Sequence, residues 1–192
     1  MPTKVYMHWN YFLALEADLE FLSRYIELTE DNYDVYSTEL IKILFAACSG
    51  IDAVTKSFCE EFGTNDDYSK LGMRYDTLKK NMNLFSEDVH LHKYELTIKP
   101  FEDWTNAKCP NWWTSYNNVK HNLTTNYHQG NLRNCVSAIA GLFLISLEYY
   151  CHDLIVDEEG EKHEFYFPKE YLSLVLSETK LLRLSNEFYK EE

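Results

Sequence analysis

Apolar residues recur at intervals of three and four along the first third of the chain, which is the spacing of an amphipathic helix. The first series predicts a helix that ends near Asn32, and it consists of Phe12, Leu15, Leu19, Leu22 and Ile26. After a polar stretch the same spacing returns from Leu40 to Phe58, and Gly63 is placed as a C-terminal stop. The two segments together predict an antiparallel pair of helices.

The middle of the chain contains one further helical series and then an irregular stretch. The apolar series at residues 68–82 predicts a third helix. From residue 84 to 109 the periodicity fails, and Pro100 is incompatible with a continuing helix. We interpret this stretch as a connector that contains a short extended piece at residues 94–98.

Two more helices are predicted in the second half of the chain. Pro110 and Asn111 mark the start of a helix that runs from Trp112 to about Thr125. Gly130 separates it from a long helix at about residues 131–153. This long helix is apolar on nearly every side, so we expect it at the centre of a bundle.

The last part of the chain predicts a hairpin followed by a helix. Residues 154–156 and 165–167 flank an acidic turn around Gly160, and a last helix starts near Pro168. The predicted fold is therefore all-α, a bundle of five or six helices with a small β hairpin near residues 154–167. We expect one domain that spans residues 1–192, because this length is sufficient for one core.

Neither the N-terminus nor the most apolar segment indicates a membrane protein. The first residues lack the charged start and apolar core of a signal peptide. The segment from Val136 to Leu147 ends at Glu148, well short of the ~20 residues that span a bilayer. The five cysteines are an odd number and form no CxxC pair, which favours reduced thiols and therefore a reducing compartment such as the cytoplasm. We expect a cytoplasmic protein without membrane association.

Charge is distributed unevenly in this acidic chain. It has 31 Asp and Glu against 18 Lys and Arg, a formal net charge of −13, which disfavours nucleic-acid binding through a broad basic surface. Residues 104–147, however, contain no carboxylate, where an even distribution would place roughly seven. The same window contributes Lys108, Lys120 and Arg133. An anion would therefore approach the chain most easily here.

Inside this window lies a row of residues with the chemistry of a phosphate site. On a helix, one face would hold Trp113, Asn117, Lys120, His121 and Thr124. An imidazole exchanges a proton near neutral pH, an ammonium supplies charge, and an amide orients the ligand. The alternative interpretation is that His121 is an interior hydrogen-bonded histidine and that Trp112 and Trp113 fill the core.

The motif Trp112-Trp113-x-x-Tyr116-Asn117-x-Val119-Lys120-His121, preceded by Pro100-Phe101-x-x-Trp104, resembles the WWxxYNxxKH pattern of bacterial proteins similar to the HEPN superfamily. The resemblance covers roughly residues 94 to 150. It implies a helical bundle, metal-independent cleavage of RNA in bacterial conflict or antiphage defence, and an active site formed across a symmetric homodimer.

The family motif is an Arg, usually followed by a polar residue, with four to six residues between that Arg and a His. Aligned at the shortest spacing, His121 matches the catalytic His and Asn117 the polar residue, while the Arg position falls on Tyr116. The longer spacings place it on Ser115 or Thr114, so no register supplies an Arg. The HepT-like subset carries a Tyr two residues after the His, where this chain has Leu123.

Other candidate sites are weaker. His90 and His92 could bind a metal together with Glu87, Asp88 or Glu95, but two histidines in an acidic loop are more typical of solvated polar residues. The sequence contains no glycine-rich phosphate loop and no Gly-x-Ser-x-Gly motif. We therefore expect no metal and no cofactor.

Two hypotheses of function follow from the sequence. In the first, the protein is a HEPN-like ribonuclease toxin or defence effector in which His121 transfers protons, with Lys120, Asn117, Tyr116, Trp113 and Arg133 around the RNA. In the second, the bundle is catalytically inactive and serves as a protein-interaction or nucleotide-sensing module. Binding of a small anion at the same groove is a third possibility. The expected partners are RNA, a second copy of the chain and a regulatory protein.

Overall fold

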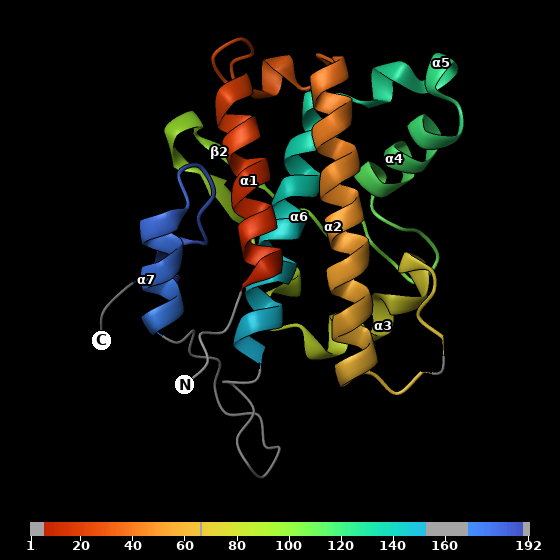
Figure 1. Cartoon of the computed structure of the whole chain (residues 1–192), viewed down its shortest axis with the longest axis vertical. Helices are drawn as coiled ribbons and strands as arrows, with labels where there is room; N and C mark the ends of the chain where they lie inside the picture. The colour runs from red at the N-terminus through yellow and green to blue at the C-terminus, as the bar shows by residue number, and fades with distance from the viewer. Residues whose placement is uncertain (1–5, 66, 153–168, 190–192) are drawn as a thin grey trace.

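A computed structural model describes residues 6–65, 67–152 and 169–189, and most of these residues are helical (Figure 1). Within them lie α1 Met7–Leu22, α2 Thr38–Phe62, α3 Tyr75–Asn81, α4 Asn111–His121, α5 Leu123–Asn126, α6 Leu132–Cys151 and α7 Lys169–Glu178. Two strands, β1 Val89–Leu91 and β2 Leu96–Ile98, pair as an antiparallel hairpin. The prediction of an all-α bundle that includes a small hairpin is confirmed as a fold class, although this hairpin lies at other residues than the predicted one.

Short 3-10 helices connect several of these elements. They are η1 Glu30–Asn32, η2 Leu71–Arg74, η3 Asn83–Ser86, η4 His92–Tyr94, η5 Tyr127–Gln129 and η7 Asn186–Tyr189. Two of them lie near α4. Residues of η2 face α4 across a cavity, and η5 follows α4 and α5 in the chain.

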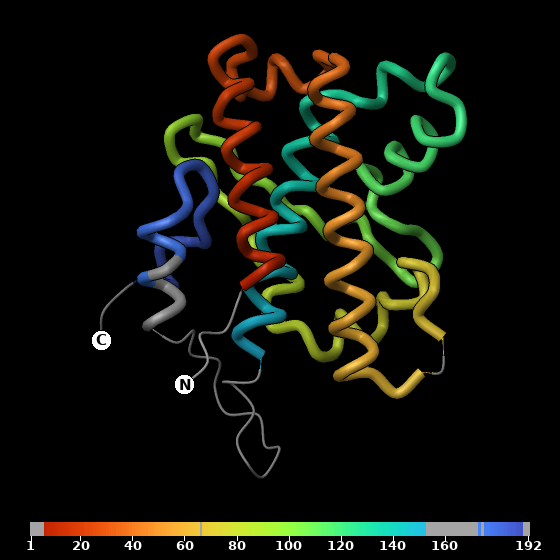
Figure 2. The backbone as a smooth tube through the Cα atoms, in the orientation of Figure 1, coloured from red at the N-terminus to blue at the C-terminus, as the bar shows by residue number. Residues whose placement is uncertain are grey.

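The long helix α6 lies behind α1 and α2, while α4 and α3 lie on one side of the bundle and α7 on the other (Figures 1 and 2). Asn131 caps α6 by accepting a hydrogen bond from the backbone N–H of Asn134 at 3.1 Å. Among the described residues, α6 is the one helix long and apolar enough to span a membrane, but 89% of its apolar window is buried. It is the core helix that the sequence predicts.

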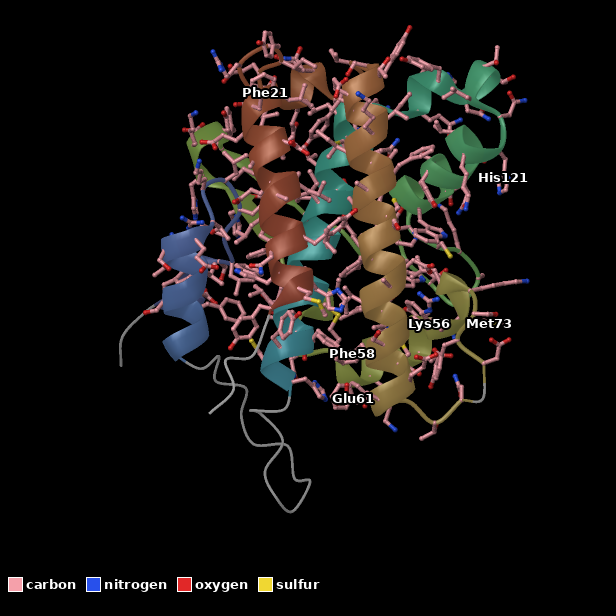
Figure 3. The ribbon with its side chains drawn as sticks, in the orientation of Figure 1. Phe21, Lys56, Phe58, Glu61, Met73 and His121 are labelled. Carbon is pink, nitrogen blue, oxygen red and sulfur yellow. The ribbon has the colours of Figure 1, made fainter. Side chains whose placement is uncertain are left out.

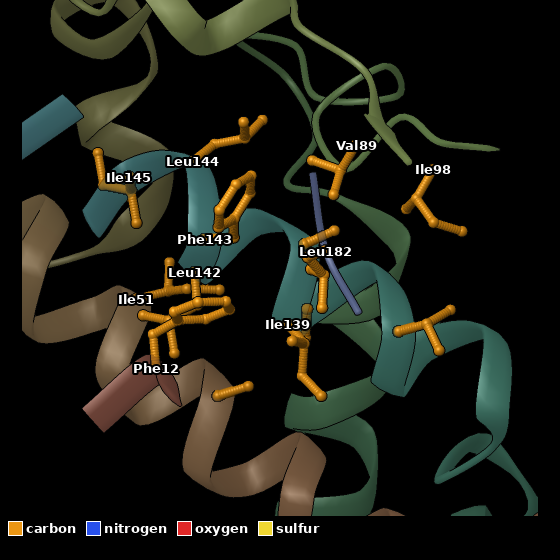
Figure 4. Close-up of a cluster of buried hydrophobic side chains, with 14 of the residues drawn as sticks. Phe12, Ile51, Val89, Ile98, Ile139, Leu142, Phe143, Leu144, Ile145 and Leu182 are labelled. Carbon is orange, nitrogen blue, oxygen red and sulfur yellow. The ribbon is translucent and has the colours of Figure 1, made fainter. Parts of the chain in front are cut away.

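The core is built on two sides of α6. Phe12 of α1 lies against Phe143 with ring centroids 5.3 Å apart, and Ile51 of α2 lies beside them (Figure 4). On the other side are Val89, Ile98 and Leu182 (Figure 4). One cluster of buried side chains therefore extends from α1 to the segment after α7. Such burial is the main source of stability in a domain of this size.

Helix boundaries differ from the prediction where side chains bond to the backbone. The first helix ends at Leu22 rather than near Asn32, and Ser23 donates from Oγ to the carbonyl of Glu20 at 2.7 Å. The third α-helix begins at Tyr75 rather than near residue 68. There the guanidinium of Arg74 bonds to the carbonyl of Tyr68 at 2.8 Å, which holds the preceding segment outside the helix.

The hairpin that the structure describes lies in the segment predicted to be irregular. The register pairs Val89 with Ile98 and Leu91 with Leu96, so four apolar side chains face the core. Only the second strand was indicated by the sequence, as the extended piece at residues 94–98. The hairpin predicted near residues 154–167 lies outside the described residues.

Candidate functional site

The helix α4 is anchored by its buried side. Trp112 and Val119 are buried, and the indole Nε1 of Trp112 donates to the carbonyl of Pro100 at 2.7 Å. The helix begins after Pro110, as predicted, and Asp103 accepts a hydrogen bond from the N–H of Asn111 at 2.9 Å. These contacts determine which side of α4 faces away from the core.

The outer side of α4 lines an open cavity of about 490 Å³. Three residues of the predicted row, Trp113, Asn117 and Lys120, contribute to it, together with Tyr116. The opposite wall is the segment Ser69–Met73, and Asp52 and Cys109 complete the lining. We call this space the α4 cavity. It brings together most of the residues that the sequence singles out.

The charges around the α4 cavity leave an excess of cations. Lys70 and Lys120 are both exposed at its edge. Its one carboxylate, Asp52, lies 2.9 Å from Nη1 of Arg74, whose guanidinium is fully buried. This ion pair offsets the negative charge of Asp52, so the two ammonium groups are the net charge of the lining. Outside the lining, hydrogen bonds with Ser69 lower the pKa of the Asp67 carboxyl, and the nearby ammonium of Lys70 adds to this shift.

The aromatic wall of the α4 cavity is held by ring packing. Trp113 and Tyr116 have centroids 5.1 Å apart at 49°, and Phe45 of α2 meets Tyr116 edge-on at 5.2 Å. The ammonium of Lys120 lies 5.4 Å from the centroid of the Tyr116 ring. Asn117 donates from Nδ2 to the carbonyl of Trp113 at 3.0 Å. Three of the five residues of the predicted row therefore lie together at the α4 cavity.

His121 lies outside the lining of the α4 cavity. It is the last residue of α4, its side chain is exposed, and it points away from the bundle (Figure 3). Its imidazole has no hydrogen-bond partner among the described residues. The ring is consequently accessible to a substrate, and the interpretation of His121 as an interior hydrogen-bonded residue is wrong. The row does not continue to Thr124, because the chain leaves the helix at Asn122.

The segment after His121 is organised by amide side chains. Asn118 donates to Oε1 of Gln129 at 2.9 Å, and Gln129 donates to Oδ1 of Asn126 at 3.1 Å. Asn126 in turn donates to the carbonyls of Asn118 and Asn122. This network holds α5 and η5 against the end of α4. Asn118, Asn122, Asn126 and Gln129 are spaced four, four and three residues apart, but the patterns of apolar and charged residues do not single out these amides.

Arg133 does not join Lys120 at the α4 cavity. Its guanidinium stacks on the ring of Tyr33, 4.5 Å from the centroid. It lines a different cavity of about 460 Å³, together with Glu30 of η1 and with Lys99 and neighbouring residues of the loop before α4. Arg133 and Lys120, both expected around the RNA, therefore line separate cavities in a single chain.

The histidines of the β1–β2 hairpin stack on each other rather than converge with acids. Their ring centroids are 5.6 Å apart, and Nδ1 of His90 lies 3.1 Å from Oγ1 of Thr97. Burial lowers the pKa of His90 below its ordinary value of 6.5. Among the described residues, no group of three or more His, Cys, Asp or Glu side chains is arranged to hold a metal ion.

The far wall of the α4 cavity could not be found from the sequence. Lys70 and Met73 come from η2 and the turn before it, about a quarter of the chain ahead of α4. Cys109 is half-buried, and burial raises the pKa of its thiol above the ordinary value of 9.0. That thiol is therefore protonated near neutral pH, which argues against a role as a nucleophile. All five cysteines are free.

Comparison with models of known protein families, with curated proteins and with solved structures gave no match to this chain.

Proposed function

We propose that this chain is a HEPN-like protein that cleaves RNA without a metal, in bacterial conflict or antiphage defence in the cytoplasm. The observation that carries the proposal is the exposed imidazole of His121 next to the exposed ammonium of Lys120 at the end of α4. Both lie in the window without carboxylates, so an RNA phosphate can approach them without repulsion from nearby acids on the same segment.

The chemistry requires a proton acceptor beside a ribose hydroxyl. In the proposed reaction, His121 removes the proton of a 2′-hydroxyl, and the resulting oxygen attacks the adjacent phosphate. A 2′,3′-cyclic phosphate forms as the bond to the 5′-oxygen of the next nucleotide breaks, and that oxygen takes up a proton from water. Lys120 stabilises the negative charge on the phosphate. One N–H of the Asn117 amide donates to the carbonyl of Trp113, which leaves its second N–H and its oxygen to orient the RNA.

A homodimer would complete this site. One chain presents one imidazole and one ammonium at the end of α4, while Arg133 lies in another cavity. The resemblance to HEPN domains implies that two copies meet at the motif, which would double these groups around one phosphate. A regulatory protein that covers the same surface would keep the enzyme inactive.

The test compares His121→Ala with His128→Ala. Both histidines are exposed, and His128 lies in the nearby turn η5, so it controls for the loss of an imidazole in the same region. Incubated with mixed cellular RNA in chelator, His121→Ala should cleave about two to four orders of magnitude more slowly than the parent. The His128 variant should match the parent. Equal cleavage by parent and His121→Ala would exclude His121 as the proton-transfer group.

A second candidate is a catalytically inactive HEPN-like bundle that binds a protein partner or senses a nucleotide. The observation that favours it is that Tyr116, which occupies the Arg position of the motif, packs against Phe45 and beneath Lys120. A phenol in that place provides no fixed positive charge for a phosphate. This candidate predicts that the parent protein leaves RNA intact in chelator and that its expression does not slow growth.

A further inference from the structure

The α4 cavity offers a ligand one flat aromatic surface. Among the four tryptophans, Trp9, Trp104 and Trp112 are at most 3% exposed, whereas Trp113 is half-buried and lines the cavity. Its ring is held edge-on to Trp112 and tilted against Tyr116. A planar ring can therefore stack on Trp113 without rearranging the core.

Facing this surface is a mixed wall of apolar and cationic side chains. Leu71 and Met73 provide apolar contacts, and Lys70 and Lys120 place ammonium groups at the edge. Because the carboxylate of Asp52 is already paired with Arg74, it does not offset these two cations. A ligand with an aromatic part and an anionic part fits this distribution of groups.

Asn117 adds hydrogen-bonding capacity. One N–H of its side-chain amide donates to the carbonyl of Trp113, which orients the group. The amide oxygen and the second N–H have no partner among the described residues, and an amide in this state can pair with the edge of a nucleobase. The volume of about 490 Å³ lies within the range of cavities that hold small organic ligands.

We propose that the α4 cavity binds a nucleoside phosphate, with the base stacked on Trp113 and the phosphate between Lys70 and Lys120. The inference rests on the cavity, which His121 does not line, and not on RNA cleavage. It names the ligand class and the binding residues of the nucleotide-sensing role considered above. The proposed nucleotide binding is the same whether or not the protein cleaves RNA.

Titration of the protein with AMP, GMP, CMP and UMP tests this proposal. Stacking on Trp113 should quench the intrinsic fluorescence, and at least one of these nucleotides should do so. The corresponding nucleoside should bind at least about tenfold more weakly, because it lacks the charged hydrogen bonds to the two ammonium groups. Inorganic phosphate should cause no quenching. No calorimetric or fluorescence signal with any of the four nucleotides at millimolar concentration would overturn the proposal.

Variants locate the binding site. Lys70→Gln and Lys120→Gln should each weaken binding of the nucleotide about tenfold, because each removes one charge-assisted hydrogen bond. Lys42→Gln is the matched control, since Lys42 is an exposed lysine that lines another cavity, between α1 and α2. In Trp113→Phe the fluorescence change should disappear while calorimetry still detects the ligand. Equal affinity of the Lys70 and Lys42 variants, or quenching that persists in Trp113→Phe, would place the ligand elsewhere.

The outcome is separable from the test of cleavage. If the protein binds a nucleotide but leaves RNA intact, the result supports nucleotide binding at the α4 cavity and excludes the proposed ribonuclease activity. RNA cleavage that depends on His121, without binding of any nucleoside monophosphate, supports the proposed ribonuclease activity and excludes nucleotide binding at the α4 cavity.

Discussion

Nη1 of Arg74 lies 2.9 Å from Oδ1 of Asp52, and the arginine side chain is 1% exposed while the aspartate side chain is 50% exposed. The same guanidinium also bonds to Oγ1 of Thr55 and to the backbone carbonyls of Tyr68 and Asp52. Arg74 therefore joins α2 to the segment that forms the far wall of the α4 cavity. It also offsets the one carboxylate in that cavity.

Replacing Arg74 should weaken both the fold and the cavity. Arg74→Ala removes the buried hydrogen bonds to the carbonyl of Tyr68 and to Oγ1 of Thr55 and the ion pair with Asp52, which should lower the free energy of unfolding by about 3 kcal/mol. Urea denaturation measures this loss. Arg74→Lys keeps the charge but cannot form the same set of bonds, so it should recover only part of the stability. An unchanged urea midpoint in Arg74→Ala would show that the guanidinium contributes little.

Truncation should separate the roles of the two adjacent tryptophans. Trp112 is buried and hydrogen-bonded to Pro100, so Trp112→Ala should cost about 3 to 5 kcal/mol of unfolding free energy. Trp113 is half-buried, and Trp113→Ala should cost less than about half as much, because less apolar surface leaves water on folding. Thermal and chemical denaturation compare them. Equal losses would mean that Trp113 is a core residue and not a binding surface.

A buried carboxylate connects α1 to the segment after α7. Glu16 is 2% exposed and accepts hydrogen bonds from the backbone N–H groups of Lys180, Leu181 and Leu182 at 2.9 to 3.0 Å. Glu16→Ala should lower the free energy of unfolding by about 2 to 4 kcal/mol, because two buried donors and one partly buried donor lose a charged acceptor. Hydrogen exchange at residues 180–182 should accelerate.

Glu20 provides the control for that variant. Its carboxylate pairs with the ammonium of Lys180 at 2.8 Å, but both side chains are exposed to water. Glu20→Ala should change stability by less than about 1 kcal/mol, since exposed ion pairs contribute little. If the Glu16 and Glu20 variants unfold at the same urea concentration, the buried bonds are not what holds the segment.

Acid should weaken the fold in part through His90. Burial and the neighbouring His92 lower the pKa of His90 below 6.5, while Asp88 acts in the opposite direction. Below pH 6.5 the unfolded chain therefore binds this proton more readily than the folded protein does. Stability that is present above pH 6.5 is lost as the pH falls toward the lower, folded-state pKa.

The comparison of the parent with His90→Gln measures this contribution. Between pH 7 and pH 5.5 the parent should lose more stability than the variant, because glutamine does not titrate. Denaturation at a series of pH values gives the two slopes. A steeper loss in His90→Gln than in the parent would contradict the direction of the pKa shift. Burial also lowers the pKa of His8, so part of the acid sensitivity should remain in the variant.

The sequence alone determined the class of the fold and the face of α4. The three-and-four spacing of apolar residues predicts α2 and α6 because only a helix buries such a series on a common side. The same periodicity places Trp113, Asn117 and Lys120 together, as the structure has them. These inferences depend on local geometry, which neighbours along the chain specify.

Only the tertiary structure decided what faces those residues and which way each site residue points. Lys70 reaches the α4 cavity because Arg74 bonds to Tyr68 and Asp52, a long-range contact without any period in the sequence. His121 is the last residue of α4, because the chain leaves the helix at Asn122, and its side chain is exposed to solvent. Arg133 stacks on Tyr33 and lines another cavity than Lys120 does. Hydrogen bonds and ring contacts between distant segments determine such placements, and helical spacing carries no information about them.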